Sequence, residues 1–289
     1  MLDLLFSVLL TGVLFLVFKG FKKYKIDNLQ AIIVNYAVAF SIGFVLSKSS
    51  VSFQDIPNQP WFLGAVVLGV LFVTVFNVLA LTTQKFGFSV VSVASKMSLV
   101  VPVIFAVYMY GDRLNELKVL GLIFALLAVY FITKKNDEHQ SFDKKQLYLP
   151  LVLFVGAGVL DTMLKYIETT YVNPSEFELY TATIFMMAGS FGLLFVLLKK
   201  LFFKGEIVLN YKNVIAGICL GVPNFFSIYY LLRALNTPKI SSATIFTINN
   251  VSVVLLATII GVLFFKEKLS KLNWLGAILS IIAILLFYF

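Results

Sequence analysis

The chain has 289 residues, of which 60% are hydrophobic and only 13% are charged. A soluble domain of this size would carry about 25% charged residues, so the composition excludes an ordinary soluble globular protein. Lys and Arg outnumber Asp and Glu by 23 to 14. In a membrane protein such an excess sets the orientation of the loops, and no motif of a nucleic-acid-binding protein accompanies it.

Ten apolar segments follow one another along the chain. The hydrocarbon core of a bilayer is about 30 Å thick and requires about 20 apolar residues per helical crossing. Because lipid offers no hydrogen bonds to the backbone, a chain this apolar must cross as helices. We therefore predict an all-α polytopic membrane protein with ten transmembrane helices. The predicted spans are 2–18, 29–47, 61–84, 88–110, 115–133, 147–168, 176–198, 213–235, 240–265 and 271–289.

The first span is expected to remain in the protein. Met1-Leu2-Asp3 lacks the positive charge that opens a secretory signal peptide, and the nearest lysines follow the apolar run. The connections between spans are short, for example 84–87 and 111–114. A longer polar segment, 134–146, lies near the middle of the chain and divides it into two halves, 1–133 and 147–289.

The two halves carry the same landmarks in the same order. Each has Ala-Leu, then an acid, a base and Leu, and then Gly nine residues after the acid. These are Ala80-Leu81, Asp112-Arg113-Leu114 and Gly121 in the first half, and Ala234-Leu235, Glu267-Lys268-Leu269 and Gly276 in the second. Gly12 and Lys19 also match Gly158 and Lys165 in spacing. The sequence therefore predicts an internal duplication of a five-helix repeat.

Five crossings per repeat place the second repeat upside down relative to the first. Inverted repeats are common in secondary transporters, whose substrate sites lie near the middle of the membrane between the repeats. Loops after the odd-numbered spans carry sixteen lysines, against six Lys or Arg residues on the opposite side. We expect the protein to lie in the plasma membrane or inner membrane of the cell. The positive-inside rule then places the lysine-rich loops in the cytoplasm and both termini on the outer side.

Lys96 is the first candidate for a functional residue. It lies about three residues from the middle of the fourth span, too deep to reach the interface easily, and Ser92 is one turn away on the same face. An ionisable residue at this depth costs roughly 2.5–3.5 kcal/mol and is a functional-site hypothesis by default. Lys96 could contact the substrate or the coupling ion. Alternatively, it could be a structural lysine that is hydrogen-bonded between helices or paired with a carboxylate.

Asp161 in the sixth span is the candidate for coupling to protons. Lys165 follows four residues later, so the two can pair along one helix face. A titratable or substrate-binding carboxylate and a purely structural ion pair remain equal alternatives. A pair between Asp161 and Lys96 is also possible.

Neutral polar side chains are predicted at similar depths. An amide in hydrocarbon needs a partner, so each should face another helix or water. With an offset of 154 residues between the repeats, Asn250 corresponds to Lys96. For a single Asn, packing between helices is the commoner role, but so many together favour a cavity. The candidates for its lining, besides Lys96 and Ser92, are Asn35, Asn77, Asn224, Ser227, Tyr230, Asn249 and Asn250.

No cofactor or metal site is predicted. Cys219 is the one cysteine and is expected to be a small core residue, and His139 is the one histidine, in the 134–146 segment. No nucleotide-binding glycine loop, nucleophile elbow or His-Glu-x-x-His motif is present, so the residues for ATP-driven pumping or hydrolysis are lacking.

These landmarks resemble those of the drug/metabolite transporter superfamily, in particular its ten-helix EamA/RhaT-like transporters. Gly12 and Lys19 match a Gly-x₆-Lys motif of that family, although Thr11 replaces the Trp that usually precedes the Gly and Asp112 replaces a commoner Glu. The resemblance implies proton-coupled or exchange transport of small organic solutes. It also implies a central cavity lined by the first, third, fourth, sixth, eighth and ninth spans. Family members are generally drawn with cytoplasmic termini, whereas the lysine count favours external ones.

The sequence therefore predicts a secondary transporter that exports small organic metabolites by alternating access and is not an enzyme. Its expected partners are the lipid bilayer and a small substrate, with a preference for an anionic or zwitterionic one because of Lys96. Monomer and homodimer both stay open. One alternative is an intramembrane enzyme acting on lipid-linked substrates, for which only Glu176, Glu178 and Tyr180 lie near the membrane interface. Two others are an exchanger of organophosphates or nucleotide sugars and a non-transporting assembly subunit.

Overall fold

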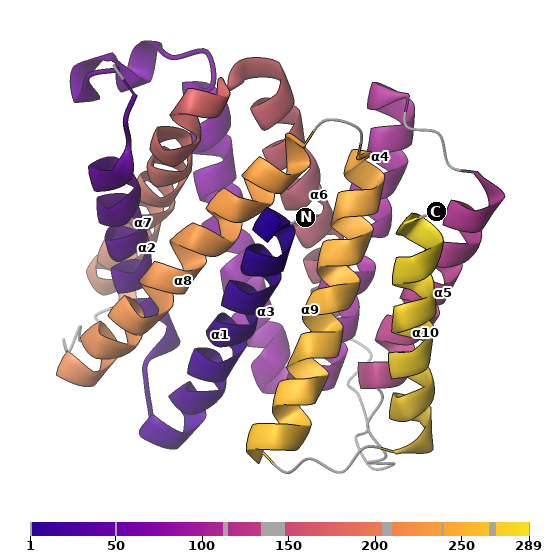
Figure 1. Ribbon diagram of the computed structural model, residues 1–289. Coiled ribbons are helices and arrows are strands. Elements are labelled where there is room, and N and C mark those ends of the chain that lie inside the picture. The colour runs from indigo at the N-terminus through magenta and orange to yellow at the C-terminus, as the bar shows by residue number, and fades with distance from the viewer. Residues whose placement is uncertain are drawn as a thin grey trace. The chain divides into compact units, whose positions relative to one another are not determined.

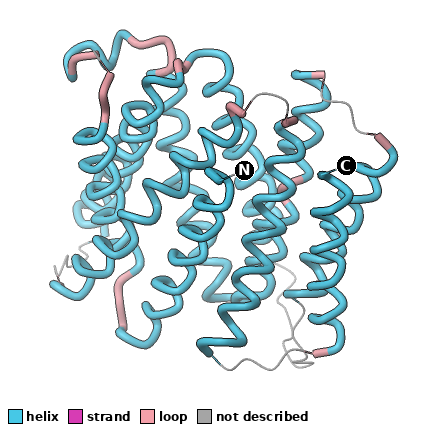
Figure 2. The backbone as a smooth tube through the Cα atoms, in the orientation of Figure 1, coloured by secondary structure: helices cyan, strands magenta, loops and turns pink. Residues whose placement is uncertain are grey.

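The computed structural model describes residues 2–49, 51–111, 115–133, 148–203, 210–237, 240–265 and 270–288. The regular structure of these residues is entirely helical, and short loops join the helices (Figure 1, Figure 2). This confirms the all-α prediction. The long helices are α1 (Leu2–Tyr24), α2 (Asn28–Leu46), α3 (Phe62–Met97), α4 (Val100–Tyr110), α5 (Glu116–Thr133), α6 (Tyr148–Tyr171), α7 (Phe177–Phe203), α8 (Tyr211–Leu235), α9 (Ser242–Phe265) and α10 (Lys271–Tyr288). Two short 3₁₀ helices, η1 (Phe53–Asn58) and η3 (Pro174–Glu176), lie in loops.

Six helical segments of the described chain are long and apolar enough to cross a membrane. They are Asn28–Leu46, Phe62–Leu79, Tyr148–Tyr171, Pro174–Leu198, Tyr211–Leu235 and Ser242–Ile260. Leu2–Phe18, Ala94–Met109 and Lys271–Leu286 are shorter apolar helical segments. The chain is thus a polytopic membrane protein.

The connection predicted at 84–87 is wrong, because α3 has helical backbone without interruption from Phe62 to Met97. Gly87 alone costs a helix only about 1 kcal/mol, and no proline stands near it. The interruption comes instead at Ser98 and Leu99, before α4. Pro102 stands in the first turn of α4, where its missing N–H needs no helical acceptor. Gly111 ends α4 with a φ of 65°, a conformation that glycine adopts without strain.

The chain folds into two compact units. Unit 1 consists of Met1–Asn77 and Met163–Asn236, and unit 2 of Val78–Thr162 and Thr237–Phe289. Each unit therefore takes a segment from each half of the sequence. The compact units divide the chain in space, whereas the repeats divide it along the sequence, so the units do not test the repeats. The repeats 1–133 and 147–289 stay a prediction. The polar segment 134–146, with His139, lies outside the described residues.

In unit 1, small residues let α8 approach α2 closely. A Cβ atom added to Gly217 would lie 2.5 Å from Val34 Cβ, and one added to Gly221 would lie 2.6 Å from Val38 Cβ. Glycines four residues apart share a helix face and allow such close packing in membranes. Asn213 supports this contact, because its Nδ2 donates to Gln30 Oε1 at 2.9 Å.

Cys219, in the same helix α8, is exposed and not a core residue as predicted. The reason is its register. Cys219 lies between Gly217 and Gly221, which face α2, and a helical residue two positions from such a face points away from it. On a lipid-facing surface an apolar thiol meets no penalty, so composition alone did not distinguish the core from the lipid side.

In unit 2, α5 and α10 lie side by side (Figure 1). Asn273 Nδ2 donates to the carbonyl oxygen of Phe131 at 2.9 Å and so joins the two helices. The buried core of these helices includes Ala125, Val251 and Ala283. Since α9 contributes Val251 to this core, it is fixed against α5 and α10, and its polar residues are held in place.

Candidate functional site

The clearest polar contact inside unit 2 joins α3 and α9. Lys96 is half-buried in the last turn of α3, and its Nζ donates a hydrogen bond to Asn250 Oδ1 at 3.3 Å. Asn250 is buried, and its Nδ2 donates to the carbonyl oxygen of Phe246 at 3.1 Å. The amide is thereby oriented with its oxygen toward the ammonium group.

Asp161 brings a carboxylate to the same unit. It is half-buried in α6, and its negative charge interacts with the positive charge of Lys96. Lys96 thus has an amide oxygen as its described hydrogen-bond partner and the Asp161 carboxylate as a nearby opposite charge. Together Lys96, Asn250 and Asp161, which we call the α3–α9 cluster, offer one cation, one anion and one amide within apolar helices.

Asn249, next to Asn250, is also buried, and its Oδ1 has no hydrogen-bond partner among the described residues. A buried amide oxygen without a partner costs about 1–3 kcal/mol, so this atom is an available acceptor. The side chain of Ser92 lies outside the described part, and the predicted contact of Ser92 with Lys96 stays a prediction.

The predicted residues of unit 1 form a separate set of contacts. Asn224 Nδ2 donates to Asn35 Oδ1 at 3.1 Å, joining α8 to α2. Ser227 Oγ donates to the carbonyl oxygen of Asn224 at 2.9 Å, and Ser7 Oγ donates to the carbonyl oxygen of Ser227 at 2.8 Å. These buried contacts hold α1, α2 and α8 together, as expected for packing between membrane helices.

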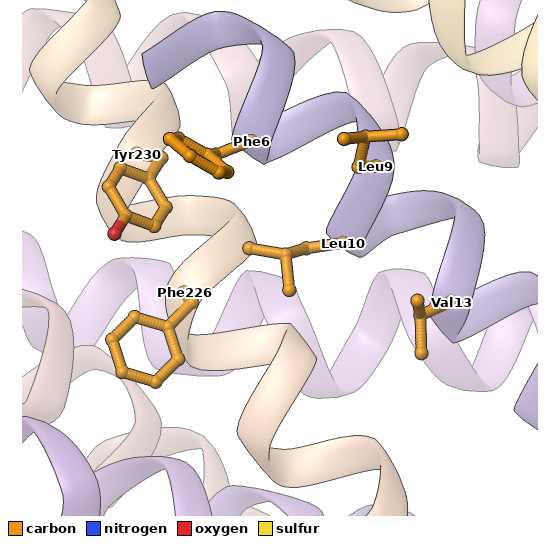
Figure 3. Close-up of a pocket in the computed structure, with 6 residues that line it drawn as sticks. All are labelled: Phe6, Leu9, Leu10, Val13, Phe226 and Tyr230. Atoms are coloured by element: carbon orange, nitrogen blue, oxygen red, sulfur yellow. The ribbon is translucent and has the colours of Figure 1, made fainter. Parts of the chain in front are cut away.

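Two other predicted residues have different surroundings. Asn77 is half-buried, and its Nδ2 donates within α3 to the carbonyl oxygen of Val73 at 2.8 Å. Tyr230 packs against Phe6 with ring centroids 5.2 Å apart and the ring planes tilted by 32°. It lines a groove between α1 and α8 (Figure 3).

The described ion pair of Lys165 is with Glu168, and not with Asp161, which the sequence offered as one alternative partner. Lys165 Nζ lies 2.8 Å from Glu168 Oε2 and also donates to the carbonyl oxygen of Leu235 at 2.9 Å. Both side chains are buried, which requires such pairing. Sequence reasoning missed Glu168, although a spacing of three residues from Lys165 is as favourable for pairing as a spacing of four.

Tyr180, which the sequence analysis named only for the enzyme alternative, has a buried hydroxyl. Tyr180 is fully buried in α7, and its hydroxyl has no hydrogen-bond partner among the described residues. No group of three or more His, Cys, Asp or Glu side chains in the described chain is arranged to hold a metal ion. The chemistry of the described sites is therefore that of charge pairing and hydrogen bonding.

Comparisons with known proteins bear on the family and the fold of the chain. Residues 146–289 match the model of the EamA-like transporter family. The chain is 29% identical over 295 residues to an uncharacterized protein of Haemophilus influenzae (strain ATCC 51907 / DSM 11121 / KW20 / Rd), covering 99% of this chain and 97% of that protein. A protein of known crystal structure, 12% identical, has the same fold with a TM-score of 0.76 over 99% of this chain and 94% of its own. Residues 146–289 therefore form an EamA-like transporter domain, a membrane-transporter domain of the drug/metabolite transporter type.

Proposed function

We propose that this transporter is a secondary exporter of small organic metabolites that bear an anionic or zwitterionic group. The observation that supports the proposal most is the hydrogen bond of Lys96 Nζ to Asn250 Oδ1 within apolar helices. Transport by alternating access would follow from the predicted inverted repeats.

Lys96 supports the choice of substrate charge. A lysine in a membrane helix is costly, and one amide oxygen returns only part of the hydration that the ammonium loses. The Asp161 carboxylate balances its charge while no substrate is bound. A substrate carboxylate or phosphate would compete for the same ammonium, so binding would separate the charges of Lys96 and Asp161.

This competition offers a route to coupling. If substrate takes the Lys96 ammonium, Asp161 loses its counter-charge and gains affinity for a proton. Carrying this proton outward with the substrate would oppose an inward proton gradient, so an exporter of this kind would be driven by the gradient of the substrate itself or by exchange for a second substrate. With both termini outside, as the lysine bias suggests, the lysine-rich loops would face the cytoplasm, from which an exporter takes its substrate.

An intramembrane enzyme receives less support from the residues considered for it. Glu176 Oε2 accepts a hydrogen bond from Trp61 Nε1 at 2.8 Å, and Glu178 Oε1 accepts one from the Tyr229 hydroxyl at 2.8 Å. Both carboxylates thus have structural partners in unit 1. A nucleotide-sugar or organophosphate exchanger differs only in the substrate, and the test below includes both classes.

The test is counterflow in proteoliposomes that contain the purified protein. Vesicles are loaded in turn with amino acids, carboxylic acids, sugar phosphates or nucleotide sugars, and entry of the labelled compound is measured. The proposal predicts that one anionic or zwitterionic class exchanges, and that Lys48→Ala, which removes an exposed lysine, exchanges at the wild-type rate. Absence of counterflow for every class, with folded protein in the vesicles, would contradict the proposal.

A further inference from the structure

Unit 1 contains an apolar groove between α1 and α8 that includes none of the residues of the α3–α9 cluster. It has a volume of about 350 Å³ and is lined by Phe6, Leu9, Leu10, Val13, Phe226 and Tyr230 (Figure 3). Phe6, Leu9 and Val13 are 46%, 45% and 42% exposed. These exposed side chains are all apolar, so the groove offers a surface that an acyl chain would fit.

A pair of opposite charges lies at one end of this groove. Arg233 Nε is 3.6 Å from Asp3 Oδ1, and their side chains are 48% and 28% exposed. Asp3 lies one helical turn before Phe6, and Arg233 lies one turn after Tyr230. The guanidinium also lies over the Tyr229 ring, with Cζ 5.7 Å from the ring centroid. The charge pair is therefore fixed at the rim of the groove and remains accessible.

The position of the pair matches the level of lipid head groups. Asp3 is in the first turn of α1 and Arg233 in the last turn of α8, and the ends of membrane helices lie at the interface. From Asp3 to Val13 the helix rises about 15 Å, at roughly 1.5 Å per residue. This is about half of the roughly 30 Å hydrocarbon core, so the groove extends over the depth of one leaflet.

We propose that this groove binds one phospholipid whose head group carries a primary ammonium, such as phosphatidylethanolamine. An acyl chain would occupy the groove, the phosphate would contact Arg233 and the ammonium would contact Asp3. The paired charges match a zwitterion, whereas an anionic head group would meet the Asp3 carboxylate. A quaternary ammonium has no N–H to donate to Asp3, so phosphatidylcholine would bind less well.

The experiment uses delipidated protein in detergent and follows its thermal unfolding as lipid is added. A ligand of the folded state raises the apparent stability by mass action. Phosphatidylethanolamine, phosphatidylcholine and phosphatidylglycerol with identical acyl chains are compared. Half-maximal stabilisation by phosphatidylethanolamine should need about tenfold less lipid, as expected for one charge-assisted hydrogen bond. Equal stabilisation by the three lipids would overturn the proposal.

Two variants test the head-group contacts, and a third tests the groove. Asp3→Asn and Arg233→Gln should remove the preference for phosphatidylethanolamine, whereas Lys48→Gln should keep it. Leu10→Trp, which fills the groove, should weaken stabilisation by all three lipids. A preference that survives in both head-group variants would overturn the assignment.

Native mass spectrometry of the wild-type protein gives an answer that does not depend on any variant folding. After incubation with equimolar lipids, one bound phosphatidylethanolamine per chain is expected. Retention of phosphatidylglycerol instead, or formation of a dimer that excludes lipid, would contradict the proposal.

Discussion

Lys96 and Asn250 are 154 residues apart in the sequence, yet Lys96 Nζ lies 3.3 Å from Asn250 Oδ1. The nearest preceding landmark of the two predicted repeats, Ala80 and Ala234, gives the same offset of 154, and the next one, Asp112 and Glu267, gives 155. Equivalent residues of two repeats can touch only near the symmetry axis that relates the repeats. The contact of Lys96 with Asn250 is therefore the kind of contact that the predicted duplication would produce.

The first prediction concerns the charge of Lys96. Asn250→Asp would place a carboxylate beside the ammonium and neutralise it without removing it. We expect the KM for an anionic substrate to rise by roughly tenfold or more, as for the loss of one hydrogen bond to a charged group. Counterflow at increasing substrate concentration measures this effect. Asn28→Asp, in the first turn of α2, is the matched control and should leave the KM unchanged.

The second prediction concerns coupling through Asp161. If this carboxylate carries the proton, Asp161→Asn should still exchange substrate, but its flux should no longer respond to a pH gradient. Uptake with and without an imposed gradient measures the response. Asp55→Asn, in the exposed η1 segment, should keep it. Undiminished gradient dependence in Asp161→Asn would remove this residue from the coupling mechanism.

The third prediction concerns the buried pair of Lys165 and Glu168. Removing one member leaves the other charge buried without its partner, which costs roughly 3–5 kcal/mol. We therefore expect Lys165→Met to lower the stability of the purified protein strongly. The double variant Lys165→Met with Glu168→Gln should recover part of the loss, because neither charge remains. Thermal unfolding in detergent measures both effects, with Lys212→Met as the exposed control. A double variant no more stable than Lys165→Met would show that the two charges are not coupled.

The fourth prediction concerns the contact of α8 with α2. In Gly217→Ala the new Cβ would lie 2.5 Å from Val34 Cβ and 2.7 Å from the Ala31 carbonyl oxygen. Such overpacking typically costs about 1–3 kcal/mol. Gly20→Ala should not destabilise the protein, because the nearest atom to its Cβ would be 3.8 Å away. Equal unfolding temperatures for the two variants would contradict the described packing.

The helical fold and the contact between Lys96 and Asn250 were predictable from the sequence for physical reasons. Long apolar segments in lipid have no alternative to helices. Lys96 could be located because a charge inside such a segment stands out, and Asn250 because the repeat offset pointed to it. The Gly217-x₃-Gly221 spacing was also readable, although the sequence analysis did not use it.

Other features depend on three-dimensional context. The connection predicted at 84–87 assumed that each membrane crossing ends in a loop, but α3 continues as helix to Met97. The partner of Lys165 could not be chosen from spacing alone, since Asp161 and Glu168 are both within one turn of it. Glu168 is the described partner because Lys165 also reaches the carbonyl oxygen of Leu235, which comes from another helix far along the chain.

Counterflow by Lys96→Ala tests the central claim most directly. The measurement uses a substrate identified with the wild-type protein and requires that the variant unfold at a temperature close to that of the wild type. The account predicts at least a tenfold loss of exchange in Lys96→Ala and none in Lys48→Ala. Exchange by folded Lys96→Ala at the wild-type rate and KM would show that the Lys96 ammonium does not bind substrate.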